Sequence, residues 1–141
     1  MEKKYFDPKD LRKFKDIKEH QPAFGDKFFS WYNEVVNGDT ALTEREKALI
    51  ALAVSHAIQC PYCIDAYTSS SLERGADEAQ MMEAVHVSAA IRSGSSLVHG
   101  VQMMNKAKKK AMLKEQAEHA TRQAQRKFNG TANRGGVKFY G

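Results

Sequence analysis

The chain contains two cysteines, Cys60 and Cys63, and both lie in the stretch QCPYCIDAYT. Two thiols at this spacing can cycle between a dithiol and a disulfide, or bind a soft metal or metalloid ion. Pro61 favours the first position of a helix, which would make Cys60 the residue that caps it. A CxxC pair at a helix start is typical of redox or metal-binding proteins.

Helix geometry bears on the reactivity of each thiol. The sulfur of a capping Cys60 would lie near the free amides and the positive end of the helix dipole, which stabilise a thiolate. Cys63 would lie one turn further along the same face, within reach of a local disulfide. Burial among apolar side chains acts in the opposite direction, because it disfavours the charged form. Electrostatics alone therefore leaves open which cysteine attacks first.

Two neighbouring side chains can move protons. Tyr67 follows Cys63 by four residues and shares its helix face, and His56 precedes Cys60 by four residues. An imidazole titrates near neutral pH, and a phenol is a neutral donor. The structural alternatives are a packed tyrosine with a satisfied hydroxyl and a histidine bonded to a helix-end carbonyl. We take both residues as tentative catalytic candidates beside the cysteines.

The remaining histidines are weaker candidates. His86 and His99 lie in apolar helical segments, where a hydrogen-bonded core histidine is the usual finding. A zinc site could combine the two cysteines with His56 or His86, but a clear fourth ligand is absent. We therefore predict neither a metal nor a cofactor.

Helices must position these residues, because no segment alternates like a strand for long. A Thr43/Glu46 capping box opens the helix that leads to Cys60, and its apolar stretch from Ala48 to Ala57 is expected to lie under neighbouring helices or in a subunit interface. The sequence predicts an all-α fold of about six helices. They begin at Pro8 (capped by Asp7), Pro22, Glu44, Pro61, after Asp77, and near Ser95 following a break or kink at Gly94; the last ends at Asn129-Gly130.

Length and composition favour one globular domain. The 141 residues are 42% hydrophobic and 28% charged, and we expect a single domain over 1–128 with a flexible or partner-bound tail over 129–141. The charged start lacks the apolar run of a signal peptide, and no apolar stretch approaches membrane length. The expectation is a cytoplasmic protein without a membrane partner.

The net charge of +5 is concentrated at one end of the chain. From Lys106 onward there are ten Lys/Arg and two Glu, which leaves twelve Lys/Arg and fifteen Asp/Glu for the rest. Binding of single-stranded nucleic acid usually combines basic residues with interleaved aromatic ones. Only Phe128 lies within the basic helical stretch, so we predict a solvated or partner-facing helix and no nucleic-acid partner.

The stretch LTEREKALIALAVSHAIQCPYCIDAYTSSSLERGADEAQMMEAV resembles the alkylhydroperoxidase-like (AhpD-like) branch of the carboxymuconolactone decarboxylase family. The likeness covers about residues 40–105 and is most specific in the apolar helix leading into CPYCI and in the Gly-Ala-Asp-Glu helix start. Within that branch, CPYCIDAYT together with HVSAAIRSGSSLVHGVQMMN resembles the arsenosugar biosynthesis-associated peroxidase-like subgroup.

The resemblance implies an all-helical homo-oligomer, commonly a trimer or hexamer that shares helices across its interfaces. It implies a dithiol that reduces a small-molecule peroxide, with Cys63 attacking, Cys60 resolving and an external thiol reductant reopening the disulfide. The active family pattern also has a glutamate twelve residues before the first cysteine and a histidine four residues after the second. Ala48 and Tyr67 occupy those places here. Glu44 and His56 are possible substitutes.

Three functions follow. The first is a thiol-dependent peroxidase-like oxidoreductase using Cys60 and Cys63. The second is a dithiol module that binds trivalent arsenic or an organoarsenical with little turnover, since soft thiolates suit such ions. The third, a non-redox decarboxylase, is disfavoured by the CxxC pair.

Overall fold

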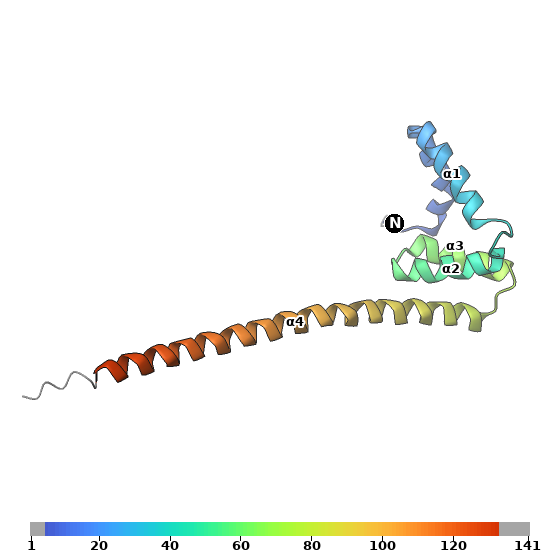
Figure 1. The fold of residues 1–141 in the computed structure, drawn as a ribbon. Coiled ribbons are helices and arrows are strands. Elements are labelled where there is room, and N and C mark those ends of the chain that lie inside the picture. Colours follow the sequence, from blue (N-terminus) through green and yellow to red (C-terminus); the bar gives the residue numbers. More distant parts are fainter. Residues whose placement is uncertain (1–4, 133–141) are drawn as a thin grey trace, which may run out of the picture. The chain divides into compact units, whose positions relative to one another are not determined.

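The computed structural model describes residues 5–132, and five helices account for most of them. No strand occurs among the described residues, so the predicted all-α fold is confirmed. The chain divides into two compact units, one extending to Gly94 and one beginning at Ser95. The helices are η1 (Pro8–His20, a 3-10 helix), α1 (Pro22–Val36), α2 (Glu44–Ala57), α3 (Pro61–Glu73) and α4 (Glu78–Ala132), labelled from α1 in Figure 1.

Side-chain caps begin the helices where the sequence predicts them. The Asp7 carboxylate caps η1, ahead of Pro8. In the capping box of α2, Thr43 Oγ1 accepts the Glu46 N–H at 3.2 Å and the Glu46 carboxylate accepts the Thr43 N–H at 2.7 Å. Asp77 accepts the Gln80 N–H at 2.8 Å just before α4. These bonds satisfy amides that a helix start leaves without an intrahelical partner.

The break that was one of two predicted possibilities at Gly94 does not occur, and about six predicted helices become five. One helix, α4, runs for 55 residues through Gly94 and through Asn129-Gly130. A glycine inside a helix costs about 1 kcal/mol relative to alanine, which weakens a helix without forbidding it. The predicted tail over 129–141 therefore begins inside the helix, and residues 133–141 lie outside the described part of the chain.

The buried side chains at the α2–α3 packing are mostly small. In the first unit α2 and α3 lie side by side (Figure 1), and Ala48, Leu52 and Ser55 of α2 and Ser71 of α3 are buried. Small residues allow two helix backbones to approach closely. Burial of α2 is only partial, because Ile50 and Val54 each remain 51% exposed in the single chain. A subunit interface over that face stays a prediction.

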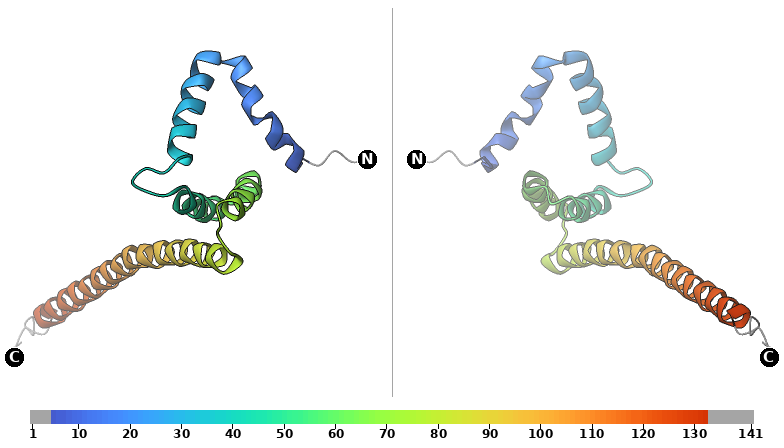
Figure 2. Two further views of the ribbon diagram at one scale, coloured as in Figure 1. Left: turned by 90° about the vertical axis from the view of Figure 1, so that its right-hand side faces the viewer. Right: turned by 90° about the vertical axis from the view of Figure 1, so that its left-hand side faces the viewer.

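The helices η1 and α1 form a hairpin, and the two helices meet at a corner near Pro22 (Figure 2). The corner is tight: a Cβ added at Gly25 would overlap Lys18, so glycine is required there. The Lys18 ammonium also pairs with Asp26 at 3.2 Å. Between the two arms, the Phe14 ring of η1 lies 5.1 Å from the Phe29 ring of α1. The hairpin is thus held by backbone approach at its corner and aromatic contact along its arms.

Among the described residues, no helix is both long enough and apolar enough to cross a membrane.

Candidate functional site

Backbone geometry on both sides of Cys60 fixes its position. Gln59 adopts the left-handed conformation with φ 54°, which ends α2 in a Schellman motif. In that motif the Cys60 N–H donates to the Ser55 carbonyl at 3.0 Å and the Gln59 N–H donates to the His56 carbonyl at 3.2 Å. Cys60 is therefore the last residue of one helix-ending motif and also the N-cap of α3. The predicted capping position is confirmed.

The two cysteines are joined in a disulfide across the first turn of α3. The Cys60 sulfur also accepts the backbone N–H of Cys63 at 3.2 Å. Both residues are partly exposed. In the reduced protein, the same amide and the helix N-terminus would stabilise a thiolate on Cys60. The chain thus holds a dithiol pair that closes locally, with one sulfur on a helix N-terminus.

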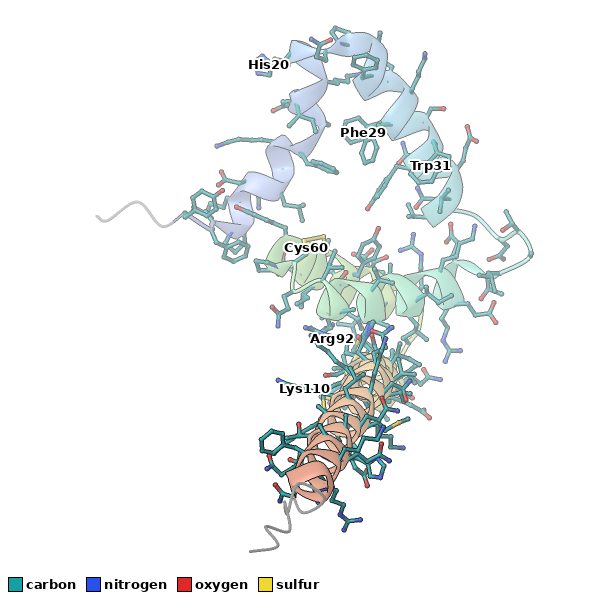
Figure 3. All side chains as sticks on the ribbon, turned by 60° about the vertical axis from the view of Figure 1, so that its left-hand side comes forward. His20, Phe29, Trp31, Cys60, Arg92 and Lys110 are labelled. Carbon is teal, nitrogen blue, oxygen red and sulfur yellow. A yellow bond between two sulfur atoms is a disulfide. The ribbon has the colours of Figure 1, made fainter. Side chains whose placement is uncertain are left out.

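A cavity of about 570 Å³ opens beside the disulfide. Figure 3 shows Cys60 on the side of α3 that is turned toward η1 and α1. The walls of the cavity come from three helices and are largely apolar and aromatic. They consist of Leu11, Phe14 and Ile17 from η1, Phe28 and Tyr32 from α1, and Tyr62, Ala66 and Tyr67 from α3, with Cys60 and Cys63 at one side and Asp10 and Lys13 as the charged members.

Tyr67 lines this cavity together with Cys63, whose helix face it was predicted to share, and its hydroxyl is hydrogen-bonded to the hydroxyl of Tyr32. Burial, followed by this hydrogen bond, raises the pKa of Tyr67 above its usual range. The phenol therefore stays neutral at physiological pH. Tyr32 was not singled out from the sequence, because a pairing of residues 35 apart depends on how α1 packs near α3.

His56 is not among the residues that line the cavity. Its Nδ1 is 2.8 Å from the carbonyl oxygen of Leu52, one turn earlier in α2. This is the structural role that the sequence left as an alternative. A catalytic role for His56 stays a prediction and would have to use its other ring nitrogen.

The positions of the family's glutamate and its suggested substitute are occupied by structural residues. Ala48 is buried in the core of the first unit. The Glu44 carboxylate accepts the Gly38 N–H and lies 3.5 Å from the Arg74 guanidinium. Arg74 in turn donates to Asn37 at 3.3 Å, so Glu44 helps to hold the loop between α1 and α2. Glu44 is not a wall residue of the cavity.

His86 and His99 are both exposed in the single chain, and neither lines the cavity. Each lies on α4. Within residues 5–132, no three or more His, Cys, Asp or Glu side chains gather where they could hold a metal ion.

A family model, described as the carboxymuconolactone decarboxylase family, matches residues 22–106. The chain belongs to this family. The matched segment contains α1, α2, α3 and the first part of α4, and therefore both cysteines. The helix η1, which supplies one wall of the cavity, lies outside the match.

One known protein and two solved structures are similar to this chain. An uncharacterised protein encoded in the cox locus of Paracoccus denitrificans is 42% identical over 74 residues, which are 52% of this chain and 67% of that protein. A crystal structure from Methanobacterium thermoautotrophicum superposes with a TM-score of 0.57 at 34% identity, covering 62% of this chain and 97% of the other. A carboxymuconolactone decarboxylase family protein from Legionella pneumophila gives 0.55 at 26% identity, covering 65% and 82%.

Proposed function

We propose that this family member is a thiol-dependent peroxidase-like oxidoreductase of the AhpD-like type, which reduces an organic hydroperoxide with the Cys60–Cys63 pair. The observation that carries the proposal is a dithiol at the start of α3, able to close into a disulfide, beside an apolar cavity of about 570 Å³. Apolar walls favour an organic hydroperoxide over the small and polar hydrogen peroxide.

The cycle balances in three steps. The Cys63 thiolate attacks the outer oxygen of the O–O bond, which breaks and leaves Cys63 as a sulfenic acid and the peroxide as an alkoxide that takes up a proton. The Cys60 thiolate then attacks the Cys63 sulfur, forming the disulfide and releasing hydroxide, which is protonated to water. An external dithiol reductant restores both thiols by thiol–disulfide exchange and is itself oxidised to a disulfide.

The proposal is tested by peroxide consumption with dithiothreitol as the reductant. We expect sustained turnover of cumene hydroperoxide by the wild-type chain and its loss in Cys63→Ser. Asp65→Asn, which changes a polar residue of the same helix outside this cavity, is the matched control and should retain turnover. Consumption by the wild type no faster than dithiothreitol alone would refute the peroxidase function.

A second function is favoured by the residues around the dithiol. No histidine lines the cavity, and its carboxylate, Asp10, is paired with Lys13 at 3.1 Å. A site without an unpaired general base suits stoichiometric binding, and the resemblance to the arsenosugar-associated subgroup suggests trivalent arsenic or an organoarsenical as the ligand. Uptake of one arsenite per reduced chain, with little peroxide turnover, would support this binding function.

We also propose that the chain assembles into a homo-oligomer, a trimer or hexamer. Ile50, Val54 and Ile58 follow one another at intervals of four residues along α2 and are each more than half exposed. Such a contiguous apolar ridge is typical of a protein interface. We expect Val54→Glu to lower the mass measured by light scattering, whereas Glu83→Gln, at another exposed position, should leave it unchanged. A monomeric wild type would contradict the assembly.

A further inference from the structure

Two phenols meet inside the cavity that holds the dithiol. Tyr67 comes from α3, one turn after Cys63, and Tyr32 comes from α1. Their hydroxyls are hydrogen-bonded to each other, and either oxygen can be the donor. The two groups carry two protons and share one hydrogen bond. In the described part of the chain neither hydroxyl has another hydrogen-bond partner, so one O–H remains for a molecule in the cavity.

We propose that Tyr67 is the catalytic proton donor to the oxygen that leaves when the peroxide O–O bond breaks, and that Tyr32 is the positioning residue that orients its hydroxyl. This inference rests on the peroxidase function proposed above. Tyr67 stands at the place where the family pattern has a histidine. A neutral phenol already carries a proton, so it can act as the donor there.

Tyr67 is the better donor of the two on geometric grounds. It stands on the same helix as Cys63, four residues later, so one rigid element sets the spacing between the attacking sulfur and the hydroxyl. Tyr32 reaches the site from a different helix, and ring contacts with Phe14 and Phe28 hold it in place. Its hydrogen bond then fixes the direction of the Tyr67 O–H.

The proton transfer balances within the cycle. The Cys63 thiolate takes the outer oxygen with its hydrogen, and the electron pair of the O–O bond passes to the inner oxygen as an alkoxide. The alkoxide takes the proton of Tyr67 and leaves as an alcohol, since an alcohol is a weaker acid than a phenol, even one whose pKa is raised. The Tyr67 phenolate takes up a proton from solvent, and the Cys60 thiolate closes the disulfide as in the cycle above.

Burial keeps the Tyr67 phenol protonated and neutral. The pKa of Tyr67 is raised, first by burial and then by the hydrogen bond with Tyr32. The phenol therefore carries its proton over the whole physiological range, although the raised pKa makes it a weaker acid than a free phenol. After donation, the same surroundings disfavour the phenolate and so drive its prompt reprotonation.

The test compares two oxidants that differ in their need for a proton donor. Cumene hydroperoxide releases a basic alkoxide, whereas peracetic acid releases a carboxylate that leaves without protonation. We expect Tyr67→Phe to lower the rate constant for cumene hydroperoxide by about a hundredfold, the lower end of what general acid catalysis contributes, and to change the rate for peracetic acid less than twofold. Tyr5→Phe, at a fully exposed tyrosine, should change neither rate.

Tyr32→Phe provides a second, independent variant. Because Tyr32 is a positioning residue, its loss should lower the rate constant for cumene hydroperoxide by a smaller factor and leave that for peracetic acid unchanged. The double variant should react no more slowly than Tyr67→Phe. Equal losses with both oxidants, or no loss in Tyr67→Phe, would overturn the role of Tyr67 while leaving the peroxidase intact. A wild type that reacts with both oxidants no faster than free dithiol would overturn both proposals.

Discussion

The sulfur of Cys60 accepts the backbone N–H of Cys63 at 3.2 Å, so the residue that caps α3 is also half of the disulfide. The Cys60 side chain therefore has two separate roles, as the N-cap of α3 and as a redox thiol. Serine keeps a capping oxygen and removes the thiol, whereas alanine removes both.

Substitutions at Cys60 separate the two demands. We expect Cys60→Ser to keep the stability of the chain, and Cys60→Ala to lose about 1 kcal/mol, a typical cost of losing an N-cap. Urea unfolding of the reduced proteins measures the difference. Equal stabilities of the two variants would show that the cap contributes nothing.

The same variants assign the attacking cysteine. With Cys60 removed, a sulfenic acid on Cys63 has no local partner, and one equivalent of dimedone should label Cys63 after exposure to peroxide. Cys63→Ser should give little labelling of Cys60. Strong labelling of Cys60 in that variant, together with none of Cys63 in Cys60→Ser, would reverse the assignment.

Phe14 tests the selectivity of the cavity. Its ring lies 5.1 Å from Phe29 and 6.1 Å from Phe28, and it forms part of the wall that η1 supplies. We expect Phe14→Ala to lower kcat/KM for cumene hydroperoxide by about five- to thirtyfold, the effect of losing roughly 1–2 kcal/mol of apolar contact. The rate with hydrogen peroxide should stay unchanged, because that substrate does not use the wall.

Phe24→Ala is the matched control for Phe14. Phe24 lies on α1, is 70% exposed and does not line the cavity. Its removal should affect neither substrate. A parallel loss of both activities in Phe14→Ala would indicate damage to the fold and would count against selectivity by η1.

Alkaline titration tests the surroundings of Tyr67. Because its pKa is raised in the folded chain, the folded state keeps a proton that the unfolded chain loses near pH 10. The resulting stabilisation is fully present below that pH and is lost as pH rises through the folded value. Among the five tyrosines we expect one phenol to ionise last, by absorbance at 295 nm, and this step to be absent in Tyr67→Phe. If the 295 nm titration curves of the wild type and Tyr67→Phe were the same at high pH, the last phenol to ionise would not be Tyr67.

Local signals in the sequence were sufficient for most helix boundaries. Capping depends on a few adjacent residues, so Thr43, Glu46 and Asp77 mark helix starts, and Pro61 places Cys60 at the N-cap. Gly94 misled the prediction because the effect of one glycine depends on the helix around it. A penalty of about 1 kcal/mol is absorbed when many good helix formers flank it.

The site was predictable only where it follows from spacing along one helix. Cys60, Cys63 and Tyr67 share α3, and their proximity could be predicted from helical geometry. Tyr32 and the η1 wall come from other elements, and the sequence contains no local signal for their packing beside α3. His56 illustrates the converse: its spacing from Cys60 suggested a role, but its Nδ1 lies against the Leu52 carbonyl.

A single turnover tests directly whether Cys60 and Cys63 reduce a peroxide. Fully reduced chain is mixed rapidly with one equivalent of cumene hydroperoxide, quenched with acid at successive times, and analysed by mass spectrometry. We predict a Cys60–Cys63 disulfide, two hydrogens lighter than the dithiol, forming many times faster than free dithiothreitol is oxidised under the same conditions. Oxidation no faster than that of the free dithiol would contradict this prediction.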